Sequence, residues 1–160
     1  MEALQWLATS PLAAALKGSG TLYLFVNAAH ILSIGLIVGA IIPLDLRLLG
    51  LFRRFPLSAL GPYLSRSAAV GIALAVLTGT CLFSVRPAEY AANPAFLTKL
   101  TLLVCGVVNA LVIHSSRRWK IAIGDEPVPP LLRFHAFLSL MIWPAALLAG
   151  RWIGFIVETG

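Results

Sequence analysis

The sequence has little charge: 11% of its 160 residues are Asp, Glu, Lys or Arg, against about 25% in an ordinary soluble domain. Its two cysteines are too few for a disulfide framework. Hydrophobic residues make up 59% of the chain, and the mean hydropathy is +0.93. A soluble domain of this size cannot bury so much apolar surface, and a disordered chain carries far less. The composition therefore predicts one membrane-embedded domain over residues 1–160.

The charges that are present leave four long uncharged stretches. A bilayer core of about 30 Å is crossed by roughly 20 helical residues, and each stretch suffices for one crossing when flanking Lys and Arg side chains reach the interface. Barrel strands would alternate polar and apolar residues, which runs such as ILSIGLIVGAII do not. The sequence predicts an all-α, up-down bundle of four transmembrane helices at about 21–46, 67–85, 94–116 and 131–157.

The first residues, 1–17, lie outside these crossings. The first cation is Lys17, whereas a secretory signal begins with positive charge. Ser10-Pro11 is a helix-start pattern, and Trp6 suits the membrane interface. The segment is therefore expected to form a short helix lying on the membrane surface.

Positive charge is unevenly shared between the two sides of the predicted bundle. The side with loops 47–66 and 117–133 is rich in Arg and Lys, and the other side carries few. Cytoplasmic loops are enriched in these residues, so both termini are predicted in the periplasm of a bacterium, with the protein in its inner membrane. The net charge of +6 is thereby explained without nucleic acid. The cations of the richer side are Arg47, Arg53, Arg54, Arg66, Arg117, Arg118, Lys120 and Arg133.

All three histidines fall within or at the ends of predicted crossings, where ionisable side chains are costly and tend to be functional. His30 lies near the middle of the first helix, in a polar stripe expected to face the interior. His114 and His135 lie near the inner ends of the third and fourth helices, at matching depth by the 1.5 Å rise per residue. The residues that share the His30 stripe are Tyr23, Asn27 and Ser33.

These histidines predict a haem b site, because two imidazoles from different helices often hold haem iron. His114 and His135 are the predicted ligands, and His30 is an alternative that would pair with a non-histidine group. The chain would then be a small b-type cytochrome carrying electrons between a quinone or periplasmic partner and an acceptor. The cations predicted to bind the haem propionates are Arg117, Arg118 and Arg133.

Other interpretations stay open. The histidines would also serve as hydrogen-bonding groups between helices, or the His30 stripe as the site of a non-redox transporter or copper-handling subunit. Cys81 and Cys105 are read as small buried hydrophobes or soft copper ligands. No hydrolase, zinc or phosphate-loop motif is present, and whether the protein is an enzyme is left open.

Small residues on two helices allow close approach. Gly35 and Gly39 form a GxxxG on the first helix, which would suit a second copy or a larger complex. The stripe Gly71, Ala75 and Gly79 on the second helix would admit either a flat ligand or a neighbouring helix.

Several runs carry a family resemblance: AAHILSIGLIVGAIIPLDLRLLG, YAANPAFLTKL, NALVIH and AGRWIGF. They resemble an uncharacterised group of four-helix bacterial inner-membrane proteins. The layout is also loosely similar to small membrane b-type cytochromes and to the membrane domain of copper-resistance protein D. With three histidines, and none on the second helix, the chain departs from a two-haem pattern.

Overall fold

Four long helices make up most of the computed structural model, which describes residues 2–124 and 127–158, without the side chains of residues 3 and 156–158. Each is long and apolar enough to cross a membrane, and the predicted all-α four-helix bundle is confirmed. The long helices are α3 (Gly20–Leu49), α4 (Leu57–Val85), α6 (Pro94–Ser115) and α8 (Pro130–Glu158).

Four short helices connect or precede the long ones. The predicted surface segment is two helices, α1 (Glu2–Ala8) and α2 (Pro11–Gly18), because the Ser10 hydroxyl accepts from Ala13 N and begins a new helix at Pro11. Between the long helices the chain also forms α5 (Pro87–Ala92) and α7 (Arg117–Ala122).

Two helices extend further than the uncharged stretches predicted. Helix α4 begins at Leu57, ten residues before 67, because Arg66 ends the apolar stretch but is itself a good helix former. Its 29 residues span roughly 44 Å at 1.5 Å per residue, longer than a bilayer core. Pro43 lies inside α3, which continues to Leu49, three residues past the predicted end at 46.

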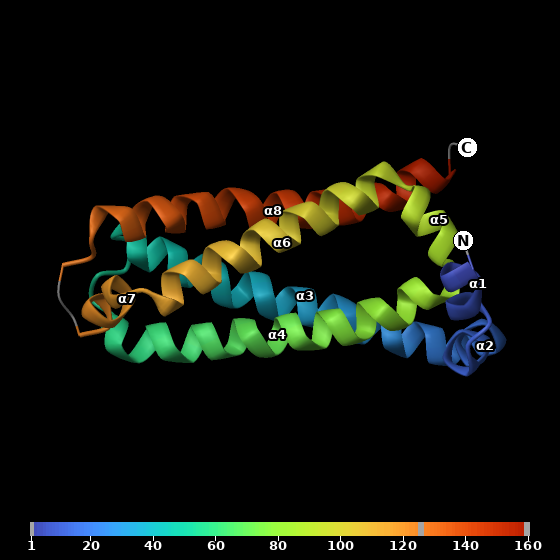
Figure 1. The fold of residues 1–160 in the computed structure, drawn as a ribbon. Helices are drawn as coiled ribbons and strands as arrows, with labels where there is room; N and C mark the ends of the chain where they lie inside the picture. The colour runs from blue at the N-terminus through green and yellow to red at the C-terminus, as the bar shows by residue number, and fades with distance from the viewer. Residues whose placement is uncertain (1, 125–126, 159–160) are drawn as a thin grey trace.

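The long helices alternate in direction and form two closely packed pairs, α3 with α4 and α6 with α8 (Figure 1). Both chain ends lie at one end of the bundle together with α1, α2 and α5, and α7 lies at the opposite end (Figure 1). We call these the terminal end and the loop end. The up-down order therefore brings all predicted arginine-rich loops to the loop end.

Close packing is concentrated toward the loop end. In α3 every buried residue lies from Ser33 onward, and in α6 from Gly106 onward. A Cβ at Gly71 would come within 2.9 Å of Ile37 Cγ1, so the small-residue stripe of α4 receives α3 rather than a flat ligand. Gly35 and Gly39 instead have nothing within 4 Å. The cluster at the loop end contains Leu44, Leu48, Leu57, Ile113, Trp119, Ala122, Leu132 and Ala136.

Candidate functional site

His114 is held by hydrogen bonds at both ring nitrogens. Nδ1 lies 2.7 Å from the Ala110 carbonyl, and Nε2 lies 2.7 Å from Ser65 Oγ of α4. The ring also packs on Trp119, with centroids 4.4 Å apart. A metal ion would have to displace one of these contacts. The geometry therefore favours a role for His114 in joining α4, α6 and α7 over a role as a metal ligand.

His135 has one nitrogen fixed and the other available. Asn109 donates from Nδ2 to the His135 carbonyl at 3.2 Å, which identifies Oδ1 as the acceptor for His135 Nδ1–H at 2.7 Å. In neutral imidazole the lone pair is then on Nε2. An imidazole oriented by a partner at Nδ1 is the usual arrangement of a metal ligand, so His135 fits a ligand role that His114 does not.

No hydrogen bond or ring contact joins the two predicted haem ligands within the described part of the chain. The partners of His114 are on α4 and α7, whereas that of His135 is on α6. The predicted propionate cations are also dispersed: Arg117 and Arg118 are exposed at the start of α7, and Arg133 lines a separate pocket at the loop end.

The His30 ring packs against α4. Its Nδ1 is 2.9 Å from Thr78 Oγ1, and Thr78 donates its only hydroxyl proton to the Leu74 carbonyl at 2.7 Å. Thr78 must therefore accept from His30, so Nδ1 carries the proton and Nε2 the lone pair. A Cβ at Gly79 would approach His30 Cε1 to 3.1 Å, so glycine there makes room for the ring.

Lys99 is a charged residue that acts electrostatically on His30. Its side chain is half-buried, interacts electrostatically with His30, and lies across Gly150 of α8, where a Cβ would be 3.3 Å from Lys99 Cδ. Lys99 was not among the predicted site residues. Its position six residues after the Asn93 N-cap of α6 already places it more than one turn inside that helix.

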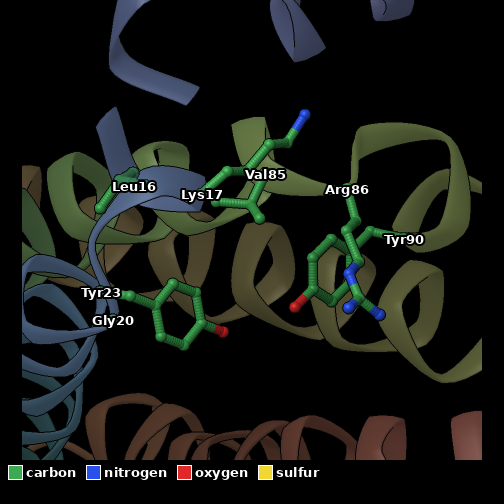
Figure 2. Close-up of a pocket in the computed structure, with 7 residues that line it drawn as sticks. All are labelled: Leu16, Lys17, Gly20, Tyr23, Val85, Arg86 and Tyr90. Carbon is green, nitrogen blue, oxygen red and sulfur yellow. The ribbon is translucent and has the colours of Figure 1, made fainter. Parts of the chain in front are cut away.

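A pocket of about 650 Å³ opens at the terminal end, between α2, α3, α4 and α5. The Tyr23 and Tyr90 hydroxyls both point into it (Figure 2). Tyr23 is on the His30 face of α3, seven residues earlier, which is about 10 Å along the axis. The other lining residues are Leu16, Lys17, Gly20, Val85 and Arg86.

The polar groups of this pocket are anchored by local contacts. Arg86 pairs with Glu89 at 3.4 Å, and Lys17 donates to the Ala8 carbonyl at 2.7 Å. Tyr90 packs beside Phe83 and Phe96. Burial raises the pKa of the Tyr90 hydroxyl, and neighbouring Tyr23 adds to the increase, so Tyr90 is a neutral donor at ordinary pH. The pocket thus combines two cations with two phenols.

The rest of the predicted stripe divides between environments. Asn27 is exposed, which corrects the expectation that the whole stripe faces the interior, because only the His30 edge meets α4. Ser33 is buried, and its hydroxyl is 2.7 Å from the Ala29 carbonyl. Of the cysteines, Cys81 is half-buried and Cys105 is exposed. Within residues 2–124 and 127–158, no three His, Cys, Asp or Glu side chains form a group that could hold a metal ion.

Residues 3–156 of the chain match the sequence model of a family of unknown function, DUF6644. The chain belongs to that family. No curated protein and no solved structure matches it. The expected resemblance to an uncharacterised family is thereby confirmed, and any function has to be argued from the side chains of the bundle.

Proposed function

We propose that the protein is a small membrane haem b protein that relays electrons, with His30 as an iron ligand. The observation that carries the proposal is the Thr78 hydrogen bond, which fixes the His30 tautomer and leaves its lone pair on Nε2 inside a membrane-spanning bundle. Haem, when bound, would supply reversible one-electron chemistry at iron.

Each residue around His30 has a separate role in this proposal. Thr78 and Gly79 orient the imidazole. Lys99 is the nearby non-histidine group, which serves as a second ligand or as a counter-charge. Lys17 and Arg86 line the pocket two turns along α3 and suit carboxylate groups such as propionates. This assignment replaces the exposed Arg117 and Arg118 as propionate partners.

The test is the visible absorption spectrum of the protein purified in detergent after expression with ample haem. We expect a Soret band in the native protein and its loss in His30→Ala. His114→Ala is the matched control, because its imidazole is already hydrogen-bonded at both nitrogens, and it should retain the band. Loss of the band in His135→Ala but not in His30→Ala would transfer the ligand role to His135.

Lys99 is tested by two variants. Lys99→Arg keeps the charge but is a poor iron ligand, whereas Lys99→Gln removes the charge. If Lys99 is a counter-charge, Lys99→Arg should keep the native spectrum; if it ligates iron, both variants should shift the Soret maximum toward a five-coordinate spectrum.

A second candidate function is binding or transport of a small organic anion, favoured by the terminal-end pocket itself. Its volume, about 650 Å³, lies within the range of small-molecule sites, and two cations and two phenols line it. If the native protein shows no Soret band, this candidate predicts that small carboxylates raise the unfolding temperature and that Arg86→Gln abolishes the effect.

The orientation belongs to the same proposal. We infer that the loop end is cytoplasmic and that both termini are periplasmic in a bacterial inner membrane, because Arg and Lys are concentrated in the loop-end segments. Reporter fusions after Lys17, at Ala91 and at Gly160 should report the outside, and fusions at Arg54 and Gly124 the inside. A cytoplasmic signal at Gly160 would contradict this orientation.

A further inference from the structure

A second pocket, of about 300 Å³, lies at the loop end, away from the His30 site. It is formed where the α3–α4 loop meets the start of α8. Three of its lining residues are arginines: Arg47, Arg53 and Arg133. The remainder of the lining is mainly apolar: Leu48, Gly50, Leu57, Ala122, Pro127 and Val128.

Local structure holds two of the guanidinium groups in place. Arg47 Nε donates to the Phe55 carbonyl at 2.8 Å, and Arg53 Nε donates to the Gly50 carbonyl at 2.9 Å. A guanidinium has five N–H donors, so each of these bonds uses one. Gly50 has φ +105°, and a Cβ there would lie 3.0 Å from Arg53 Nη2. The glycine therefore permits both the turn and the position of the Arg53 side chain.

The described lining contains no carboxylate to balance these charges. Asp45, two residues before Arg47, is buried and accepts from Ser139 instead. Across the described part of the chain, the one recorded ion pair is Arg86–Glu89, at the opposite end. Asp125 and Glu126 lie outside the described residues. Three arginines that line one pocket, with no carboxylate in its described lining, thus form an anion site by charge and by number of donors.

We propose that this loop-end pocket binds a phosphate group, carried either by the headgroup of an anionic phospholipid or by free inorganic phosphate. Phosphate offers several acceptor oxygens that match the paired N–H groups of arginine. The pocket lies just beyond the apolar stretch of α3, at the level where lipid headgroups occur, and basic pockets between helices are suited to them. The apolar lining then contacts the glycerol and upper acyl region.

The experiment uses the full-length protein in a neutral detergent. It is titrated with phosphatidylglycerol, with phosphatidylcholine of the same acyl chains, or with inorganic phosphate, and the shift in unfolding temperature gives the apparent affinity. The pocket variants are Arg53→Gln and Arg133→Gln. The controls are Arg54→Gln and Arg118→Gln, which remove one exposed positive charge from the same end of the molecule without lining the pocket.

We expect each pocket variant to weaken phosphatidylglycerol binding about tenfold, since each removes a charge-assisted hydrogen-bonding group, and each control to weaken it less than about twofold. Phosphatidylcholine should bind far more weakly in every case. Equal weakening by controls and pocket variants, or equal binding of both lipids, would overturn the proposal, because it would show only general attraction to the cationic end.

The inorganic phosphate arm separates the two sources. Tight phosphate binding that Arg53→Gln and Arg133→Gln abolish, and that competes with the lipid, identifies free phosphate as a ligand of the site. Lipid binding without measurable phosphate binding identifies the headgroup. Gly50→Ala serves as a further variant: it keeps every charge but displaces Arg53, so it should weaken binding as Arg53→Gln does. Unchanged binding in Gly50→Ala would contradict the assigned role of Arg53.

Discussion

The two halves of the bundle differ in how tightly their helices pack. Toward the loop end, the buried side chains of α3, α6 and α8 form continuous clusters around Trp119 and Trp143. Toward the terminal end, the first part of α3 has no buried residue before Ser33, and a pocket lies between its start and α5. The loop-end half thus contains most of the packing between helices, and the terminal half is more open around its pocket of about 650 Å³.

The histidines show what this difference means for function. His114, in the packed half, has both nitrogens engaged and an aromatic neighbour. His30, in the open half, has a side-chain contact at Nδ1 with Thr78, a backbone contact with Ala75 and a cation near it. A buried polar group that is fully hydrogen-bonded stabilises the fold, whereas one with an unused lone pair is suited to binding.

The largest expected loss of stability comes from a substitution in the packed half. Gly71→Val should lower the free energy of unfolding by about 3 kcal/mol, because its side chain would meet both the Ile37 side chain and the backbone of α3. Gly35→Val is the matched control and should change stability little, since nothing lies within 4 Å of a Cβ there. Unfolding in detergent measures both. A large loss in Gly35→Val as well would indicate that a partner covers that face.

A smaller loss of stability is expected when either His114 or His30 is replaced, and the two losses should differ. His114→Ala should cost about 2 kcal/mol, since it removes the contact of the ring with Ser65 Oγ and its packing against buried Trp119, while Ser65 keeps its bond to the Gly61 carbonyl. His30→Ala should cost about 1 kcal/mol or less, because it loses one hydrogen bond in the loosely packed half. Unfolding curves for both variants, recorded without added haem, provide the comparison. A larger loss in His30→Ala would contradict the division into packed and open halves.

A still smaller loss of stability is expected from removing the hydrogen bond between Thr78 and His30 in the open half. Thr78→Val preserves the side-chain shape but removes the acceptor for His30 Nδ1, so it should cost about 1 kcal/mol of stability or less. It should also broaden or shift the Soret band, because the imidazole is no longer held in one tautomer. Thr80→Val, whose hydroxyl bonds only to the Val76 carbonyl of its own helix, is the control. An identical spectrum in Thr78→Val would remove the orienting role from Thr78.

The smallest effect concerns alkaline pH at the terminal end. Because burial and Tyr23 raise the pKa of Tyr90, the stability contributed by its neutral form is fully present below the unfolded value of about 10. It is lost as the pH rises through the raised folded value. Tyr90→Phe should therefore show a weaker loss of stability above about pH 10 than the native protein. Tyr63→Phe, on an exposed tyrosine of α4, should behave like the native protein.

The four crossings and some helix ends were predictable from local patterns. The third crossing was predicted to begin at 94, where α6 does begin, and the Asn93 side chain caps this start by accepting from Ala95 N and Phe96 N. The start of α4 was misplaced at 67, because the uncharged stretch measures the membrane crossing and not the helix. The haem site stays a prediction: the hydrogen bonds at both nitrogens of His114 favour His30 as a ligand in its place, and His135 remains the alternative.

The sequence by itself determined that this chain crosses a membrane four times, because the cost of burying charge and unpaired backbone in lipid acts on each segment separately. Only the tertiary structure decided which partner groups surround each histidine. Ser65 meets His114 across 49 residues of sequence, and Thr78 meets His30 across 48. Whether an imidazole keeps a usable lone pair depends on such distant partners, and no spacing within one helix reveals them.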